Sequence, residues 1–186
     1  LSTSVFLTGT LSMAIWAASP TIPKQKSPGR SKVHEVKRDN DYLEVKVASI
    51  IPSAGSNILT LVPTHGNDRR ALKIGIGDSE ALAIGSTLHD IDLPRPMTHD
   101  ILLKSIQHLG GKVEHVILDD FRENTYFATI CLRTGKELKA LDTRPSDGVA
   151  LAMRAKCNIY IALNVQKMMV GNQSLQTLAP SRRYRN

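Results

Sequence analysis

Alternating apolar and polar residues predict three β-strands at the start of the folded region. Residues 43–47 alternate strictly, and two further apolar runs follow at 57–63 and 72–76. A period of two places successive side chains on opposite faces of a sheet, so each run fits a strand with a buried face. These segments predict the first part of a β-sheet.

Three segments have the pattern of helices. The first, around 81–84, is apolar on every side, which predicts a helix buried within the protein and capped by Asp78 or Ser79. The third, at 146–154, is also apolar nearly all round. The second, at 98–109, is amphipathic, and its apolar face consists of Ile101, Leu102, Ile106 and Leu109.

The second half of the chain predicts further strands at 113–121, 126–133 and 137–141, and a last one at 158–163. The turn-forming pair Glu123-Asn124 joins two of them, which is typical of an antiparallel meander. Strands in runs, with helices between the runs, predict an α+β fold. We expect a mixed, largely antiparallel sheet with about three helices, two of them mostly buried.

The net charge of +7 is concentrated at the two ends of the chain. Residues 1–38 contribute +5 and the last six residues +3, whereas residues 39–180 hold 15 basic and 16 acidic groups. A basic tail can bind phosphates through counterion release, but it does not select or cleave a substrate. We therefore expect a leader and linker at 1–32, a near-neutral folded domain at 33–171 and a basic tail at 172–186.

The N-terminal segment resembles the apolar core of a signal peptide. Residues 5–18 are mostly apolar and uncharged, and small residues follow before Pro20. The run is too short to span a bilayer, so we expect no membrane span in the mature chain. Leu1 in place of Met, and the lack of a preceding cation, argue against a signal peptide. We expect an exported or periplasmic protein if the segment is a signal peptide, and a cytoplasmic one otherwise.

Several common catalytic motifs are absent from the sequence. The Gly-Ile-Gly segment at 75–77 follows a predicted strand, as a dinucleotide-binding loop would, but Glu80 occupies the place of the third glycine and would repel pyrophosphate. No P-loop, HExxH or CxxC motif occurs. Cys131 and Cys157 are too few for a disulfide framework, and we expect both to be buried, with pairing between them left open.

Residues 95–100 and 144–147 share one pattern, in which Arg-Pro is followed by a hydroxyl residue and an aspartate at the start of an apolar helix. Proline holds the entering chain extended, and we expect Thr98 and Ser146 to cap the helices. An arginine is unfavourable at the positive end of a helix dipole unless an anion offsets it. The two arginines therefore either bind phosphate or pair with carboxylates. The carboxylates nearby in sequence are those of Asp100, Asp142 and Asp147.

The order and spacing of these segments resemble the bifunctional nuclease domain family. The resemblance covers about 130 of the 186 residues. It is carried by Arg95-Pro96-x-Thr98-His99-Asp100 and Asp142-x-Arg144-Pro145-Ser146-Asp147, with Ile76-Gly77, Glu80-Ala81, Leu109-Gly110, Leu151-Ala152, Arg154 and Ile159-Tyr160 around them. Thr143 and Gly148 depart from the family pattern, which usually has alanine at both positions. The resemblance implies an enzyme that cleaves DNA and RNA.

Hydrolysis of a phosphodiester needs an activated water and positive charge at the phosphoryl oxygens. A divalent metal ion on carboxylates can supply both, and so can basic side chains with a histidine base. For the activity that the resemblance implies, we assign Arg95 and Arg144 to phosphate binding and His99 to the base or a metal ligand. A metal, if used, is expected to be Mg²⁺ or Mn²⁺. The acidic residues assigned to the metal or to orienting His99 are Glu80, Asp100 and Asp147.

Supporting roles are expected for Asp142, Thr98, Ser146 and Arg154, the last as the internal partner of an acid within an apolar helix. Each assigned residue also has a purely structural interpretation, as a helix first-turn charge or as a surface imidazole. Aromatic residues make up only 4% of the chain, so a stacking platform is hard to build and we expect low base specificity.

The alternative function is a non-catalytic regulatory domain that binds an anion or a partner protein, which the near-neutral folded region favours. A third interpretation is a structural protein whose arginine and aspartate network only specifies the fold. The expected partners of a nuclease are DNA and RNA. Assembly into a homo-oligomer is left open.

Overall fold

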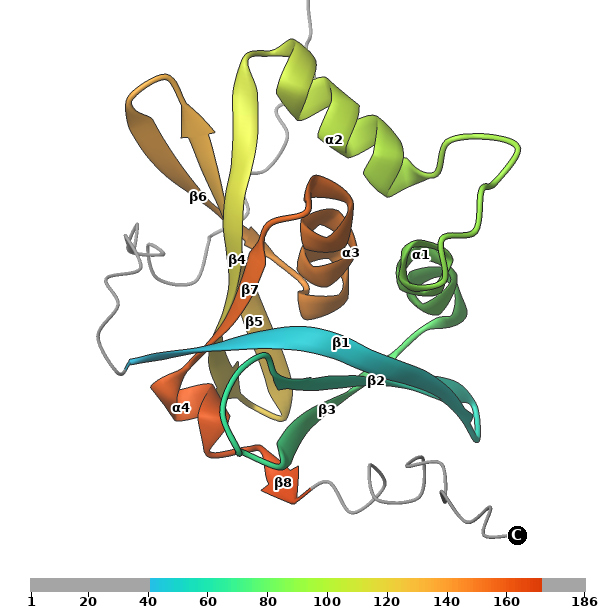
Figure 1. Cartoon of the computed structure of the whole chain (residues 1–186), viewed down its shortest axis with the longest axis vertical. Helices are drawn as coiled ribbons and strands as arrows, with labels where there is room; N and C mark the ends of the chain where they lie inside the picture. The colour runs from blue at the N-terminus through green and yellow to red at the C-terminus, as the bar shows by residue number, and fades with distance from the viewer. Residues whose placement is uncertain (1–40, 172–186) are drawn as a thin grey trace, which may run out of the picture. The chain divides into compact units, whose positions relative to one another are not determined.

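The computed structural model describes residues 41–171, which form an eight-stranded sheet with helices packed against it (Figure 1). Its elements are β1 (Tyr42–Ser53), β2 (Ser56–Pro63), β3 (Arg70–Ile76), α1 (Asp78–Leu88), α2 (Thr98–His108), β4 (Gly111–Arg122), β5 (Thr125–Thr134), β6 (Glu137–Thr143), α3 (Pro145–Ala155), β7 (Asn158–Ala162), α4 (Leu163–Gln166) and β8 (Val170–Gly171). The expected leader, the basic tail and the expected domain start at 33 lie outside the described residues. Within 41–171 no helix is long and apolar enough to cross a membrane.

The sheet combines two antiparallel meanders that are joined through β7. The strand order is β6-β5-β4-β7-β1-β2-β3-β8. β7 pairs parallel with β4 and antiparallel with β1, and the other pairs are antiparallel. This topology confirms the predicted α+β fold with a mixed, largely antiparallel sheet. Because β5 and β4 lie between β6 and β7, the connection from β6 to β7 must cross them, and α3 forms that crossing (Figure 1).

α3 lies at the centre of the helical layer. It contacts α1 and α2 as well as β4 and β5, and seven of its residues are buried, including Val149 and Leu151. Pro145 occupies the first helical position, where its fixed φ suits a helix start and its missing N–H costs nothing. Lys156, with φ of 53°, ends the helix in the left-handed region. The buried third helix is thus confirmed, and it holds the starts of all three main helices near one another.

The predicted capping side chains are wrong at all three main helices. The N-cap residues are Gly77, Met97 and Arg144, and no side-chain capping hydrogen bond is made from Asp78, Ser79, Thr98 or Ser146. These four residues lie inside the first helical turn, whereas a cap must come from the extended residue before it. At α2 the Asp100 carboxylate compensates, because its Oδ2 accepts a hydrogen bond from the Met97 backbone N at 2.7 Å.

Two helices expose apolar residues that the pattern predicted to be buried. In α1, Leu82 is 55% exposed, so this helix buries the face that carries Ala83 and Ile84 and leaves another face in solvent. In α2 no residue is fully buried, and Ile101 and Leu109 are exposed. The apolar arc of α2 is therefore wider than the part that packs against α3. The pattern also did not predict α4 or β8, which are too short for a periodic signal.

Thr143 and Gly148 lie close together at the start of α3. A Cβ on Gly148 would lie 3.3 Å from Thr143 Cγ2 and 2.9 Å from a methyl carbon of Val116. Since real Cβ atoms are rarely so close to a neighbour, an alanine at 148 would need space that the Thr143 methyl now fills. Glycine at 148 therefore leaves room for the side chains of both Val116 and Thr143 where α3 packs on β4.

Candidate functional site

Both Arg-Pro segments lead to one pocket, of about 450 Å³, among α1, the start of α2, the end of β6 and the start of α3. Its polar lining comes from Ser79, Glu80, Thr98, His99, Thr143, Arg144 and Asp147. Its apolar wall includes Leu102, Ile130 and Leu141. The pocket unites four of the residues assigned from sequence, namely Glu80, His99, Arg144 and Asp147, and we call it the Arg144 pocket.

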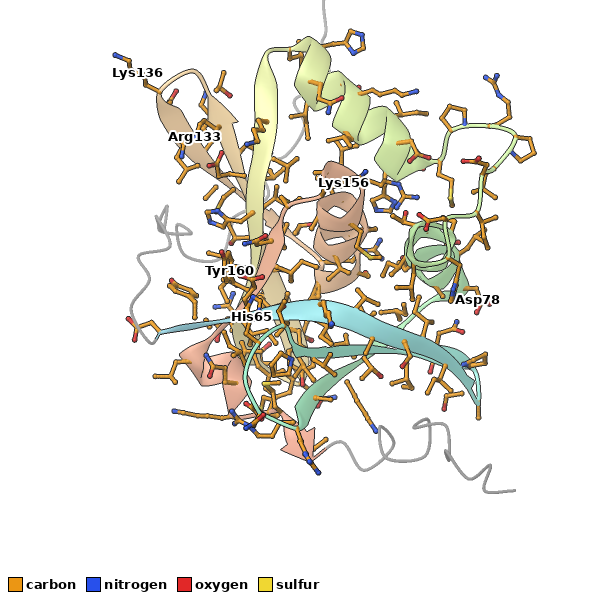
Figure 2. All side chains as sticks on the ribbon, viewed as in Figure 1. His65, Asp78, Arg133, Lys136, Lys156 and Tyr160 are labelled. Carbon is orange, nitrogen blue, oxygen red and sulfur yellow. The ribbon has the colours of Figure 1, made fainter. Side chains whose placement is uncertain are left out.

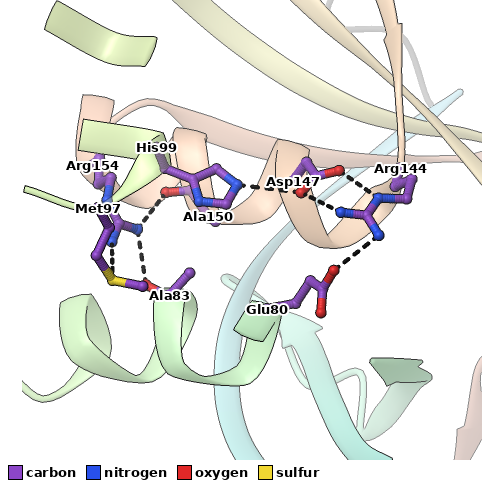
Figure 3. Close-up of polar contacts among 8 residues, drawn as sticks. All are labelled: Glu80, Ala83, Met97, His99, Arg144, Asp147, Ala150 and Arg154. Atoms are coloured by element: carbon purple, nitrogen blue, oxygen red, sulfur yellow. Dashed lines mark hydrogen bonds and ion pairs between the residues drawn. The ribbon is translucent and has the colours of Figure 1, made fainter. Parts of the chain in front are cut away.

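Arg144 is held between two carboxylates (Figure 3). Its Nε donates to Oδ2 of Asp147 at 2.6 Å and its Nη2 donates to Oδ1 at 3.0 Å. Its Nη1 lies 2.9 Å from Oε1 of Glu80. The hydrogen bond and charge of Asp147 raise the pKa of Arg144. The Arg144 side chain is nevertheless 66% exposed, so it is held by two carboxylates and still accessible to solvent.

His99 lies on the other side of Asp147. Its Nε2 is 3.3 Å from Oδ1 of Asp147, and only 13% of the His99 side chain is exposed. Burial alone raises the pKa of the Asp147 carboxyl, but the hydrogen bonds and charges of Arg144 and His99 outweigh this, and its pKa lies below the usual value. Asp147 is therefore an ionised carboxylate that contacts both a cation and an imidazole. His99 contacts Asp147 from α2, and Arg144 contacts it from the N-cap of α3.

Glu80 reaches the pocket by folding back over the start of its own helix. Gly77 permits this arrangement, because a Cβ at that position would lie 2.6 Å from Oε2 of Glu80. The glutamate sits in the first turn of α1, where the helix dipole favours a negative charge. The same carboxylate then pairs with Arg144 across the gap between α1 and α3. Helix position and tertiary pairing thus act together on one side chain.

Asp100 and Arg154 form a separate cluster behind the pocket. Arg154 Nε donates to Oδ1 of Asp100 at 2.6 Å. Figure 3 shows the bonds from its Nη1 to the carbonyl oxygens of Ala83, at 2.8 Å, and Ala150, at 3.1 Å. Burial raises the pKa of Asp100, but the Met97 N–H and Arg154 together lower it below its usual value. Arg154 is 7% exposed and links α1, α2 and α3. Asp100 is therefore turned toward Arg154, and it does not contact His99.

The remaining assigned residues lie outside the Arg144 pocket or at its rim. Arg95 is exposed and lines a neighbouring hollow of about 540 Å³ together with Asp100 and Lys104. Within residues 41–171 it makes no ion pair. Asp142 is exposed on β6 opposite Thr129. Two more residues complete the set: Thr98 at the mouth of the pocket and Ser146, which is buried in the first turn of α3.

The described residues do not form an evident metal site. No group of three or more His, Cys, Asp or Glu side chains in 41–171 is arranged to hold an ion. Glu80 and Asp147 both pair with Arg144, and Asp100 pairs with Arg154. As arranged here, the donor set does not fit a resident divalent ion. The role of Mg²⁺ or Mn²⁺ stays a prediction, and no catalytic step below depends on it.

A second groove, of about 640 Å³, lies on the other side of Arg144 and shares Glu80 with the pocket. We call it the hairpin groove, because residues of the β4–β5 hairpin line it, among them Phe121 and Tyr126. Their ring centroids are 4.4 Å apart. The sequence pattern did not predict this aromatic pair, although the position of the Glu123-Asn124 turn was sufficient to predict it. A two-residue turn fixes the register of a hairpin, and counting outward from it places the two aromatic residues opposite each other.

Comparison with known proteins agrees with the resemblance seen in the sequence. A family model described as the bifunctional nuclease domain matches residues 61–171, which include both Arg-Pro segments and the whole Arg144 pocket. An uncharacterized protein of Mycobacterium tuberculosis is 36% identical over 118 residues, which cover 63% of this chain and 70% of that protein.

Two plant relatives carry a functional name. Bifunctional nuclease 1 of Oryza sativa and a bifunctional nuclease of Oryza minuta are each 23% identical over 139 residues. The matched region covers 73% of this chain but only 40% of each plant protein. The family model spans more than half of the chain. The chain therefore belongs to the bifunctional nuclease domain family.

Proposed function

We propose that this protein is a nuclease that hydrolyses phosphodiester bonds in DNA and RNA with low base specificity. Membership of the family and the names of the plant relatives support the reaction class. The observation that carries the proposal is the continuous chain of contacts from Glu80 through Arg144 and Asp147 to His99, all in one open pocket. It brings a base, an orienting acid and a cation to the same place.

His99 is the proposed general base. Asp147 accepts a hydrogen bond from the Nε2–H of His99 in the tautomer that this contact favours, which leaves Nδ1 unprotonated. A water that attacks phosphorus would transfer its proton to Nδ1, and the Asp147 carboxylate would stabilise the resulting imidazolium. The P–O bond to the leaving oxygen would break, and water in the open pocket would protonate that oxygen. Such proton transfer contributes about 100- to 10,000-fold to a rate.

Arg144 is the proposed phosphate ligand. Glu80 and Asp147 occupy three of its N–H groups and leave one N–H on each terminal nitrogen for a phosphoryl oxygen. Because carboxylates hold the guanidinium in place, phosphate binding would cost little side-chain entropy. The proposed contacts of Arg144 and His99 are with the phosphate and the attacking water. Neither residue is assigned a contact with a base, which supports low base specificity.

One observation favours the alternative of a non-catalytic anion- or partner-binding domain. The charge of Arg144 is offset by two carboxylates, and residues 39–180 as a whole are nearly neutral. An anion would then bind weakly at the site, as expected for a regulatory contact. Binding without turnover is the outcome that this alternative predicts.

The test is cleavage of single- and double-stranded DNA and RNA by the purified full chain and by two variants, His99→Ala and Arg144→Ala. Two control variants of the same protein are each matched to one of these substitutions by residue type. His108→Ala removes an exposed histidine from the same helix, and Arg70→Ala removes an exposed arginine that also pairs with an aspartate, Asp68. Circular dichroism at the assay temperature confirms equal folding.

We expect cleavage by the full chain and both controls, a loss of about 100-fold or more in His99→Ala, and a clear loss in Arg144→Ala. Equal cleavage rates in the parent and all four variants would refute the assignment of His99 and Arg144 to the active site. Binding by the parent without any cleavage would favour the regulatory alternative. A chelator tests the metal prediction separately: unchanged cleavage in its presence would end the proposed role of Mg²⁺ or Mn²⁺.

A further inference from the structure

The hairpin groove has the features of a binding site for an unpaired nucleotide. It opens beside the Arg144 pocket, shares Arg144 and Glu80 with it, and its volume of about 640 Å³ lies within the range of small-ligand sites. A ligand that places a phosphate at Arg144 can therefore extend from one cavity into the next. The residues around the hairpin groove indicate what part of the ligand would lie there.

An aromatic pair lines the groove, and the hairpin fixes its position. Glu123 and Asn124 both have positive φ, of 49° and 58°, which is the geometry of a tight two-residue hairpin turn. The turn sets Phe121 directly opposite Tyr126, with a tilt of 44° between the rings. Both side chains are half-buried, so they keep a partly exposed aromatic surface in a rigid setting. Burial also raises the pKa of Tyr126, which keeps its ring neutral.

The opposite side of the groove supplies charge and open backbone. Lys73 on β3 is exposed and lines the groove, and within 41–171 its ammonium group makes no ion pair or side-chain hydrogen bond. Gly75, two residues along the same strand, also lines the groove and has no atom within 4 Å of where a Cβ would be, so the backbone there is open. Lys73 and Arg144 thus line the same groove as an aromatic pair, and cations combined with aromatic rings bind the phosphates and bases of a single strand.

We propose that the hairpin groove is a base-stacking subsite, in which Tyr126 stacks on an unpaired base while Arg144 and Lys73 bind phosphates. Bases in a duplex are already stacked on their neighbours, so only a single strand or an opened end can enter. The inference rests on the proposed nuclease function for the identity of the ligand. It adds a substrate class, single-stranded nucleic acid, and it assigns a stacking role to one of the few aromatic pairs in the chain.

The proposal is tested by binding of the full chain to fluorescein-labelled oligothymidine with phosphorothioate linkages, which resist hydrolysis. The comparison ligands are the same strand with abasic sites in place of the nucleosides, and a duplex of the same length. The variants are Tyr126→Leu, Tyr126→Phe and Lys73→Ala. Tyr160→Leu is the matched control, because Tyr160 is another half-buried tyrosine and lies on β7 beside His115, outside this groove (Figure 2).

We expect the parent to bind the base-bearing strand about 5- to 100-fold more tightly than the abasic strand or the duplex. Tyr126→Leu should lose most of this preference, whereas Tyr126→Phe and Tyr160→Leu should keep it. Lys73→Ala should weaken both single strands equally and reduce the salt dependence by about one phosphate contact. Equal binding of base-bearing and abasic strands by the parent would overturn the proposal, and this comparison needs no substitution.

Cleavage measured alongside separates the two proposals. If the parent cleaves nucleic acid but shows no preference for bases, the stacking subsite is wrong and the nuclease proposal stands. If the parent prefers base-bearing strands through Tyr126 but cleaves nothing, the subsite stands and the nuclease proposal is wrong. A Tyr126→Leu protein that is folded and retains the full preference would also refute the subsite.

Discussion

Replacement of Arg154 by methionine should destabilise the fold more than loss of an ordinary surface ion pair. Arg154 is 7% exposed and donates to Asp100 and to the Ala83 carbonyl, so it connects three helices. A hydrogen bond to a charged group contributes about 1.5–3 kcal/mol. Removing one partner of a fully buried pair costs about 3–5 kcal/mol, but Asp100 is 34% exposed and stays partly hydrated, which lowers that cost. Methionine roughly preserves the volume, so we expect about 2–3 kcal/mol.

Urea and thermal unfolding at neutral pH measure this loss. For a domain of this size the change corresponds to a decrease in Tm of about 8–10 °C. The control is Arg133→Met (Arg133 is labelled in Figure 2). Arg133 pairs with Glu114 through Nε at 3.0 Å, and because both side chains are partly exposed its loss should cost no more than about 1 kcal/mol. The double variant Arg154→Met/Asp100→Asn should lose less free energy of unfolding than the sum of the losses in the two single variants. If Arg154→Met costs no more than Arg133→Met, Arg154 does not hold the helices together.

Three further predictions concern stability and reactivity. Because the pKa values of Asp100 and Asp147 lie below the usual 3.8, both carboxylates stabilise the fold above about pH 3.8 and lose this effect as pH falls through the lower folded-state values. The free energy of unfolding should therefore fall with decreasing pH in the acidic range, and Asp100→Asn or Asp147→Asn should reduce the slope of this pH dependence. A slope unchanged by either substitution would contradict this prediction. Gly148→Ala should cost about 1–3 kcal/mol, and Thr143→Ala should recover part of that loss, which a double-mutant cycle of unfolding energies checks. Burial raises the pKa of Cys157 to about 11, so alkylation of the native thiol at pH 8, followed by mass spectrometry, should be about 100-fold slower than in urea; equal rates would contradict this.

Local patterns predicted the sheet well because each strand carries its own signal. The strictly alternating residues 43–47 lie within β1. The Glu123-Asn124 turn is where it was expected, and it joins the paired strands β4 and β5. The apolar third helix is buried as predicted because an all-apolar surface has no stable place in water. These features depend on residues close together in sequence.

Pairing between distant segments could not be read from sequence in the same way. Arg144 pairs with Asp147, three residues away on the same helix end, and that partner was among those considered. Arg154 meets Asp100 across 54 residues, and this depends on how α2 packs on α3. The sequence presented Asp100 beside His99 as a candidate for the catalytic group. Helical geometry separates adjacent residues by about 100°, so one enters the pocket and the other faces the cluster behind it.

The surroundings of the three arginines decide which of them can bind phosphate. Arg154 is 7% exposed, and its Nε and Nη1 donate to an aspartate and two carbonyl oxygens, so most of its donors are already used. Arg95 is exposed and makes no ion pair within 41–171, so binding there would have to order a free side chain. Arg144 is fixed by Asp147 and Glu80 and is still 66% exposed. A guanidinium that is both held and accessible binds an anion at the lowest cost in side-chain entropy, and of these three arginines Arg144 combines both properties.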